Sequence, residues 1–275
     1  MKLSRTSSML TAALLVAGLA LSACGDKEDK ASGDSKGSSA SSSASNELTK
    51  ANFAEVVTAA QAEAKTSHVV MDVGIGGQSI KGEGDVEVGS DAASTSMALV
   101  MDMGAAGAGK FDMRLVDETL YLSLGEATKG KFAKIDLTDE SNPIAKQYGK
   151  LAEQMDPSKQ LGQFAEAVKS FDKKGSPQKL DGVDAQPYEI VVETAKIPGM
   201  ADLPQGGSTA IPKTLTYTLF VGSDDLPRRI VTAVAGSKVT VDYSKWGEPV
   251  DIEAPAPDEI SDQDISKLLS GATGA

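Results

Sequence analysis

Apolar and polar residues alternate in twos along much of the chain between His68 and Asp136. The alternating apolar positions are Met97, Leu99, Met101 and Met103 in one run, Phe111, Met113 and Leu115 in the next, and Leu120, Leu122 and Leu124 in a third. Glycine-rich turn signals at 74–77, 89–91 and 104–107 separate such runs. A period of two that leaves one apolar and one polar face is typical of antiparallel strands. The pattern therefore predicts a β-meander over this region.

Three segments follow a helical period instead. Before the meander, an apolar stripe begins at Phe53 and ends at Ala64, with Thr49 as the expected N-cap. After the meander, Asn-Pro at 142–143 and Asp-Pro at 156–157 are start signals for two further helices, because proline is favoured at the first helical position. One side of the first carries Ile144, Tyr148, Leu151 and Met155, and one side of the second carries Leu161, Phe164, Val168 and Phe171. Two amphipathic helices need an apolar surface to cover, and the open face of the sheet is the one available.

Strand patterns resume after Gly175, at 185–194, 213–222, 228–235 and 238–243. A glycine- and proline-rich stretch at 197–212 is expected to be a loop, and 261–269 a short terminal helix. The predicted fold class is α+β: a strongly curved antiparallel sheet, or half-barrel, with helices covering its concave face. This domain is expected to span 47–255, with an acidic C-terminal tail over 256–275.

The N-terminus has the layout of a secretory signal peptide over 1–23. Lys2 and Arg5 precede an apolar run at 9–21, and small residues lead to the only cysteine of the chain, Cys24. The alternatives are an ordinary signal with a chance cysteine and an uncleaved anchor helix, although the run is short for a membrane span. Residues 24–46 hold nothing larger and more apolar than alanine beyond the cysteine, so they are expected to be a disordered Ser/Gly-rich tether.

Composition narrows the class of function further. Cleavage would remove Lys2 and Arg5 and leave 25 basic against 39 acidic residues, a net charge near -14. A chain this acidic repels nucleic acid and anionic lipid headgroups, so membrane attachment is expected to come from a lipid and no nucleic-acid partner is expected. With Cys24 modified, no disulfide can form. Aromatic residues make up only 4%, while nine methionines are present, so the core is expected to be aliphatic and adaptable.

Catalytic patterns are missing from the sequence. The single histidine, His68, begins a predicted strand and is expected to be a surface or strand-end residue. No G-x-S-x-G elbow, phosphate-binding loop or dinucleotide fingerprint occurs, and the ligands of a zinc or EF-hand site are lacking. We therefore expect no enzyme, no cofactor and no metal site. A catalytic pair of carboxylates that only the fold brings together stays an open alternative.

The residues 21–24, Leu-Ser-Ala-Cys, resemble the lipobox of bacterial lipoproteins. Further likeness lies in Leu-Tyr-Leu at 120–122, Lys-Phe-Ala-Lys-Ile-Asp at 131–136, Asp-Leu-Pro-Arg-Arg-Ile at 225–230 and Tyr-Ser-Lys-Trp-Gly-Glu-Pro-Val at 243–250. Together with the element order, these segments resemble the LolA/LolB-type half-barrel, and within it the actinobacterial lipoproteins of the LppX/LprG/LprA/LprF type. The resemblance implies that Leu21, Ser22 and Ala23 direct cleavage. It also implies that the thiol of Cys24 carries a diacylglyceryl group, with palmitate as an acyl chain, at the extracytoplasmic face of the cell membrane.

The same resemblance implies a hydrophobic cavity that holds an acylated lipid or glycolipid for carriage or transfer in the cell envelope. The candidate lining residues are Met97, Leu99, Met101, Met113, Leu120, Leu122, Ile144, Tyr148, Leu151, Leu161, Phe164, Val168 and Leu219. Ordinary core packing explains any one of these residues equally well. The alternative function is a non-catalytic accessory or sensor lipoprotein with a solid core, no lipid cargo and an envelope protein as its partner.

Overall fold

The alternating segments of the sequence form one continuous sheet. The computed structural model describes residues 47–75, 78–89, 94–102, 109–139, 141–142, 166–197, 212–234 and 236–261. The predicted signal peptide and tether, Met103, almost all of the two helices predicted after Asn142, residues 198–211 of the predicted loop and the terminal helix predicted after Ser261 lie outside these ranges. Our predictions for those segments stay predictions.

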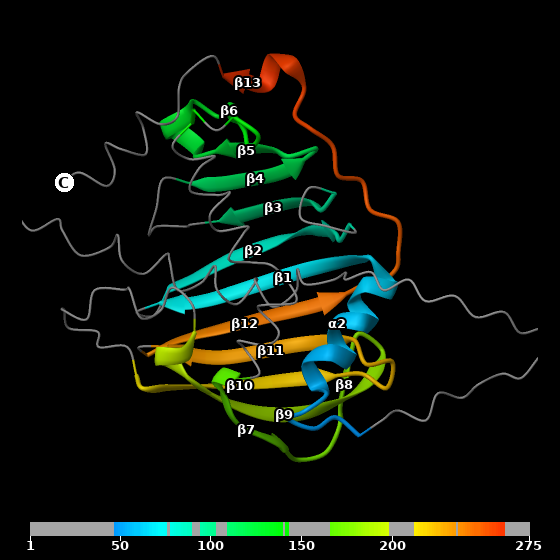
Figure 1. Ribbon diagram of the computed structural model, residues 1–275. Coiled ribbons are helices and arrows are strands. Elements are labelled where there is room, and N and C mark those ends of the chain that lie inside the picture. Colours follow the sequence, from blue (N-terminus) through cyan, green and yellow to red (C-terminus); the bar gives the residue numbers. More distant parts are fainter. Residues whose placement is uncertain are drawn as a thin grey trace, which may run out of the picture.

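Thirteen strands and three 3-10 helices are described (Figure 1). They are β1 (Thr66–Ile75), β2 (Gln78–Glu87), β3 (Ser96–Asp102), β4 (Lys110–Val116), β5 (Thr119–Ser123), β6 (Phe132–Asp136), β7 (Val168–Lys173), β8 (Gln178–Leu180), β9 (Val183–Glu193), β10 (Thr214–Val221), β11 (Pro227–Val234), β12 (Ser237–Ser244) and β13 (Ile260–Ser261). The 3-10 helices are η3 (Gly125–Thr128), η4 (Thr194–Lys196) and η5 (Pro257–Glu259). The four strands predicted after Gly175 are confirmed as β9 to β12.

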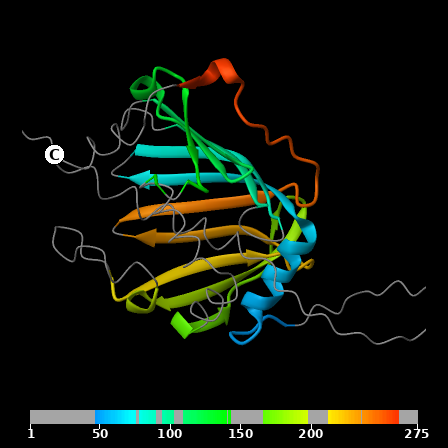
Figure 2. The same cartoon turned by 45° about the horizontal axis from the view of Figure 1, so that its top comes forward.

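The strand order is β13-β6-β5-β4-β3-β2-β1-β12-β11-β10-β9-β7, and β8 pairs with β9 beside this path. Every described pair is antiparallel except β13 with β6. The path does not return on itself, so the sheet is an open half-barrel. In Figure 2 the green strands of the β4–β6 end lie at a clear angle to the orange and yellow strands of the other end.

One α-helix is described, α2 (Phe53–Ala64), and it packs on one face of the sheet, which we call the inner face. Phe53 of the helix stacks on Phe171 of β7 at 4.5 Å between ring centroids, and Phe171 stacks on Tyr188 of β9 at 4.9 Å. The predicted N-cap was wrong by three residues, because the helix begins after Asn52. The Asn52 side chain instead accepts hydrogen bonds from the backbone and hydroxyl of Thr49, which closes a turn ahead of the helix.

The helical reading of Val168 and Phe171 was also wrong, because both belong to strand β7. A register shift between Val168 and Ser170 marks a bulge, where one extra residue is inserted into the strand. The bulge places Val168 opposite Val192 and Phe171 opposite Ile190, so residues three apart reach the same face. A spacing of three in the sequence therefore imitated a helix.

The sheet folds sharply toward its inner face at β2. Gly84 pairs with Val69 and Leu99, two residues that pack against the inner core, so its missing side chain would also point inward. A Cβ built on Gly84 would lie 2.8 Å from the Cα of Leu99 and still closer to the carbonyl oxygen of Ala98. Strand β3 thus leans over the inner side of Gly84, which is the use of glycine at a tight bend in a strand. We call this line between β2 and β3 the crease.

Candidate functional site

A strip of apolar side chains on the inner face of β3 and β4 is the candidate site. The ladder places Leu99 opposite Met113 and Met101 opposite Phe111, so the side chains form cross-strand pairs. All of them are partly buried rather than enclosed. We call this strip the apolar floor; its members are Met97, Leu99, Met101, Phe111 and Met113.

The apolar floor joins two separate core clusters. Leu99 and Met101 pack against the larger cluster, which gathers residues of α2, β1, β7 and β9–β12. Phe111 and Met113 pack against a smaller cluster of buried residues, Leu120, Leu122, Ala133 and Ile135. The described part of the sheet therefore carries two packed ends with a less enclosed apolar strip between them.

Glycine shapes the edge of the floor beside the crease. Gly82 pairs with Met71 and Met101, and their side chains converge on it: a Cβ there would lie 3.0 Å from Met101 Cγ and 3.6 Å from Met71 Cε. Methionine side chains have several rotatable bonds and adapt to irregular shapes. The methionines beside Gly82 thus border a position where the sheet itself contributes no side chain.

The other predicted lining residues occupy different places. Val168 is only 1% exposed and lies with Leu219 in the larger core cluster, and Leu120 and Leu122 are buried in the smaller one. Lipid contact by any of these residues stays a prediction. The remaining candidates lie outside the described residues: Ile144, Tyr148, Leu151, Leu161 and Phe164, and at the N-terminus Leu21, Ser22, Ala23 and Cys24.

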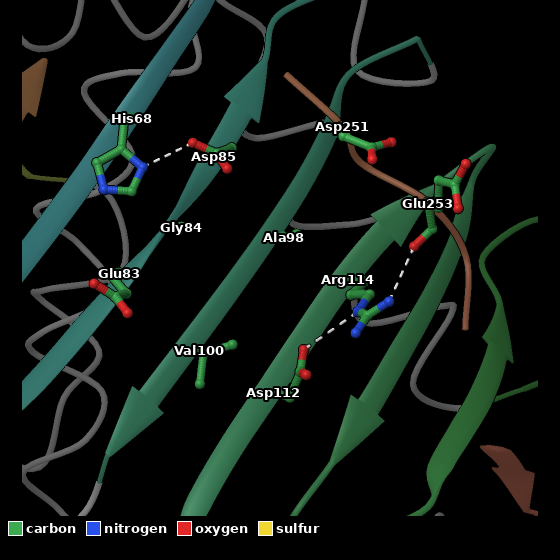
Figure 3. A pocket seen from close by; sticks show the side chains of 10 residues that line it. All are labelled: His68, Glu83, Gly84, Asp85, Ala98, Val100, Asp112, Arg114, Asp251 and Glu253. Carbon is green, nitrogen blue, oxygen red and sulfur yellow. Dashed lines mark hydrogen bonds and ion pairs between the residues drawn. The ribbon is translucent and has the colours of Figure 1, made fainter. Parts of the chain in front are cut away.

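The outer face carries a polar pocket of about 350 Å³ that the sequence analysis did not find (Figure 3). His68 Nδ1 lies 2.8 Å from Asp85 Oδ1 on the neighbouring strand, and the histidine side chain is partly buried. Arg114 and Asp251 also line the pocket, whose floor includes the small residue Ala98. Within the described ranges no group of three or more His, Cys, Asp or Glu residues could hold a metal ion. The sequence signal was faint, because the pocket residues come from four strands and the C-terminal segment.

A second polar pocket, of about 430 Å³, lies where Glu47 leads into the domain. Tyr188 lines it, and burial, followed by the charges of Glu47 and Asp225, raises the pKa of this phenol. Burial and the neighbouring Asp224 likewise raise the pKa of the Asp225 carboxyl.

Deep in the sheet, burial raises the pKa of Tyr217 to about 12 and raises that of Tyr243 further. Both phenols therefore stay neutral at physiological pH. No described helix has the length and apolar character of a membrane span.

Comparison with solved structures identifies the fold. The Mycobacterium tuberculosis lipoprotein LppX aligns with 74% of this chain and 98% of its own, at a TM-score of 0.50 and 14% sequence identity. The chain has the fold of LppX. LprF from Mycobacterium bovis aligns with 76% of this chain and 99% of its own, at a TM-score of 0.48 and 16% identity. The predicted resemblance is thus confirmed at the level of the fold. No family model matches the chain, and no curated protein matches it.

Proposed function

We propose that this chain is an exported, lipid-anchored protein that holds an acylated lipid or glycolipid against the apolar floor, for carriage or transfer in the cell envelope. The observation that carries the proposal is the floor itself. It is an apolar strip of Met, Leu and Phe side chains, partly buried, between two core clusters of an open half-barrel. The fold shared with the lipoprotein LppX supports the same proposal.

The driving force is the burial of hydrocarbon. Each buried methylene group contributes about 0.8 kcal/mol, so ten methylenes of an acyl chain would contribute about 8 kcal/mol before the costs of binding are subtracted. Straight acyl chains match a strip built along adjacent strands, and the thioethers beside Gly82 can adjust to them. The enclosure of the chain by residues outside the described ranges is part of the proposal.

Attachment and location follow from the N-terminus. Diacylation at Cys24 would supply two acyl chains, and two chains hold a protein at a membrane whereas one chain binds only reversibly. The tether at 24–46 would then let the half-barrel turn toward the bilayer. The function has no catalytic step, and its place is the extracytoplasmic face of the membrane.

Uptake of a fluorescent long-chain fatty acid tests lipid binding. Met101→Asp places a charge on the floor and should weaken uptake about tenfold or more, because ionised groups are poorly tolerated beside buried hydrocarbon. Val70→Asp is the matched control, since Val70 is 37% exposed. Its neighbour in the ladder, Glu83, lines the outer pocket, so the control lies on the outer face.

Saturable uptake by the wild type and the control, with loss in Met101→Asp, would support the proposal. Absence of uptake by the folded wild-type protein would contradict it. That result would favour the alternative, an accessory or sensor lipoprotein with a solid core.

A further inference from the structure

The C-terminal segment 248–261, which we call the strap, leaves β12 and crosses to the far end of the sheet. In Figure 1 it is the orange and red chain that joins the middle of the sheet to β13. The Thr66 hydroxyl donates a 2.7 Å hydrogen bond to the Glu248 carbonyl at its beginning. At its end, Ile260 and Ser261 pair in parallel with Phe132 and Ala133 of β6. The strap therefore ties β1 to the opposite edge of the sheet.

Arg114 fastens the middle of the strap. Its Nη1 donates a 3.3 Å hydrogen bond to the Glu253 carbonyl, and its Nε lies 3.5 Å from Asp112 Oδ1 (Figure 3). The guanidinium also lies over the Phe132 ring, 4.9 Å from the centroid. One side chain thus connects strap, β4 and β6.

The strap is stiff. Prolines at 249, 255 and 257 fix their own φ angles and hold the residues before them extended. Residues 248–256 form no helix or strand, and Pro255 is buried. Pro249 restricts the chain before the Arg114 contact at Glu253, and Pro255 and Pro257 restrict the chain after it.

The strap passes outside the crease. Asp251 and Glu253 line the outer pocket together with Gly84 and Ala98, the two residues that meet at the crease. Folding a sheet further inward lengthens the path along its outer side. A stiff connection on that side therefore resists further folding.

The lengths agree with such a role. From Thr66 to Arg114 the path crosses three strand spacings and shifts by two residues, which amounts to about 16 Å. The fastened carbonyls of Glu248 and Glu253 are five residue steps apart, which span about 17 Å when fully extended. The fully extended strap is therefore about as long as the part of the sheet that it crosses.

We propose that the strap is a strut that keeps the half-barrel open, with Arg114 as its fastening, and so sets the access of a lipid to the apolar floor. The strap then regulates the site of the proposed function, and this inference rests on that function. Release of the strap would let the β3–β6 end fold over the floor, which slows lipid entry.

Hydrogen exchange and uptake kinetics, measured on the mature lipidated protein in detergent, test the strut. Arg114→Met keeps the apolar stem over Phe132 and removes the fastening. Arg229→Met is the control, because Arg229 forms its 2.5 Å ion pair with Asp242 of β12 rather than with a residue of the strap. The double variant Pro249→Gly with Pro255→Gly loosens the strap without substituting any residue of the sheet. It replaces Arg114→Met in the test if that variant does not fold.

In the strap variants we expect exchange across 250–261 to rise about tenfold. Entry of a fluorescent long-chain fatty acid should slow about fivefold, while Arg229→Met leaves both unchanged. Faster exchange in the strap with unaltered entry would overturn the strut and leave the proposed function standing. If the wild type takes up no fatty acid, the proposed function fails. The strut is then judged by exchange in β3 and β4, and unchanged exchange there overturns it.

Discussion

Alanine at Gly84 tests the crease that shapes the half-barrel. The new Cβ would point to the inner face and lie 2.8 Å from Leu99 Cα, where ordinary contacts begin at 3.4 Å. It would also overlap with the Ala98 carbonyl oxygen. Both neighbours are backbone atoms of β3, so relief requires the whole strand to move.

Gly82→Ala is the matched control, two residues away on the same face of the same strand. Its Cβ would meet Met101 Cγ at 3.0 Å and Met71 Cε at 3.6 Å, both in flexible side chains. The side chains can adjust, and the loss of unfolded-state freedom on replacing glycine stabilises by about 0.4–1 kcal/mol. We expect a net change within about 1 kcal/mol for this variant.

For Gly84→Ala we expect a loss of about 3 kcal/mol, at the upper end of what overpacking costs, because a strand rather than a side chain must shift. Urea unfolding followed by circular dichroism and by the fluorescence of the single tryptophan, Trp246, measures both variants. Equal stability of the two variants, within about 0.5 kcal/mol, would refute the inference that the backbone of β3 leans over Gly84.

Three further expectations concern the anchor, the polar pocket beside Glu47 and the core. Cys24→Ala should move the protein from the membrane to the soluble fraction without changing its thermal unfolding, and membrane retention would favour the uncleaved anchor. Because burial and Asp224 raise the pKa of Asp225 above 3.8, the folded state binds its proton more tightly, and stability is lost as pH rises from about 3 through the raised pKa. Asp225→Asn should therefore raise the urea midpoint at pH 7 and not at pH 3, and an equal effect at both would contradict this. Phe171→Ala removes the central ring of the aromatic stack and should lower the free energy of unfolding in urea by about 3 kcal/mol. The control Val70→Ala, at an exposed position, should lower it by less than about 0.5 kcal/mol. Similar losses in the two variants would disprove the role of the stack.

The sheet could be predicted from the sequence because its inner face alternates cleanly. The runs that contain Met97, Met113 and Leu120 become β3, β4 and β5, although Leu124 follows the end of β5 and Met103 lies outside the described residues. The strands after Gly175 were likewise predictable from alternation and turns. Val168 was wrongly predicted to be helical, because the bulge gives this strand the spacing of a helix.

The site was predictable only in part. Leu99 and Met101 were named in advance, but their partial exposure depends on how the two core clusters are spaced. The crease had a visible sign in the two glycines at 82 and 84, which a period-two reading passes over. The role of Arg114 could not be predicted from the sequence, because its hydrogen-bond partner is a backbone carbonyl 139 positions away.

Native mass spectrometry of the mature protein, released gently from its own membranes, tests lipid binding most directly. Our account predicts a protein mass increased by one non-covalent acylated lipid, lost when Met101→Asp is introduced and kept in Val70→Asp. A wild-type protein that is consistently found without any lipid beyond its covalent anchor would contradict the account.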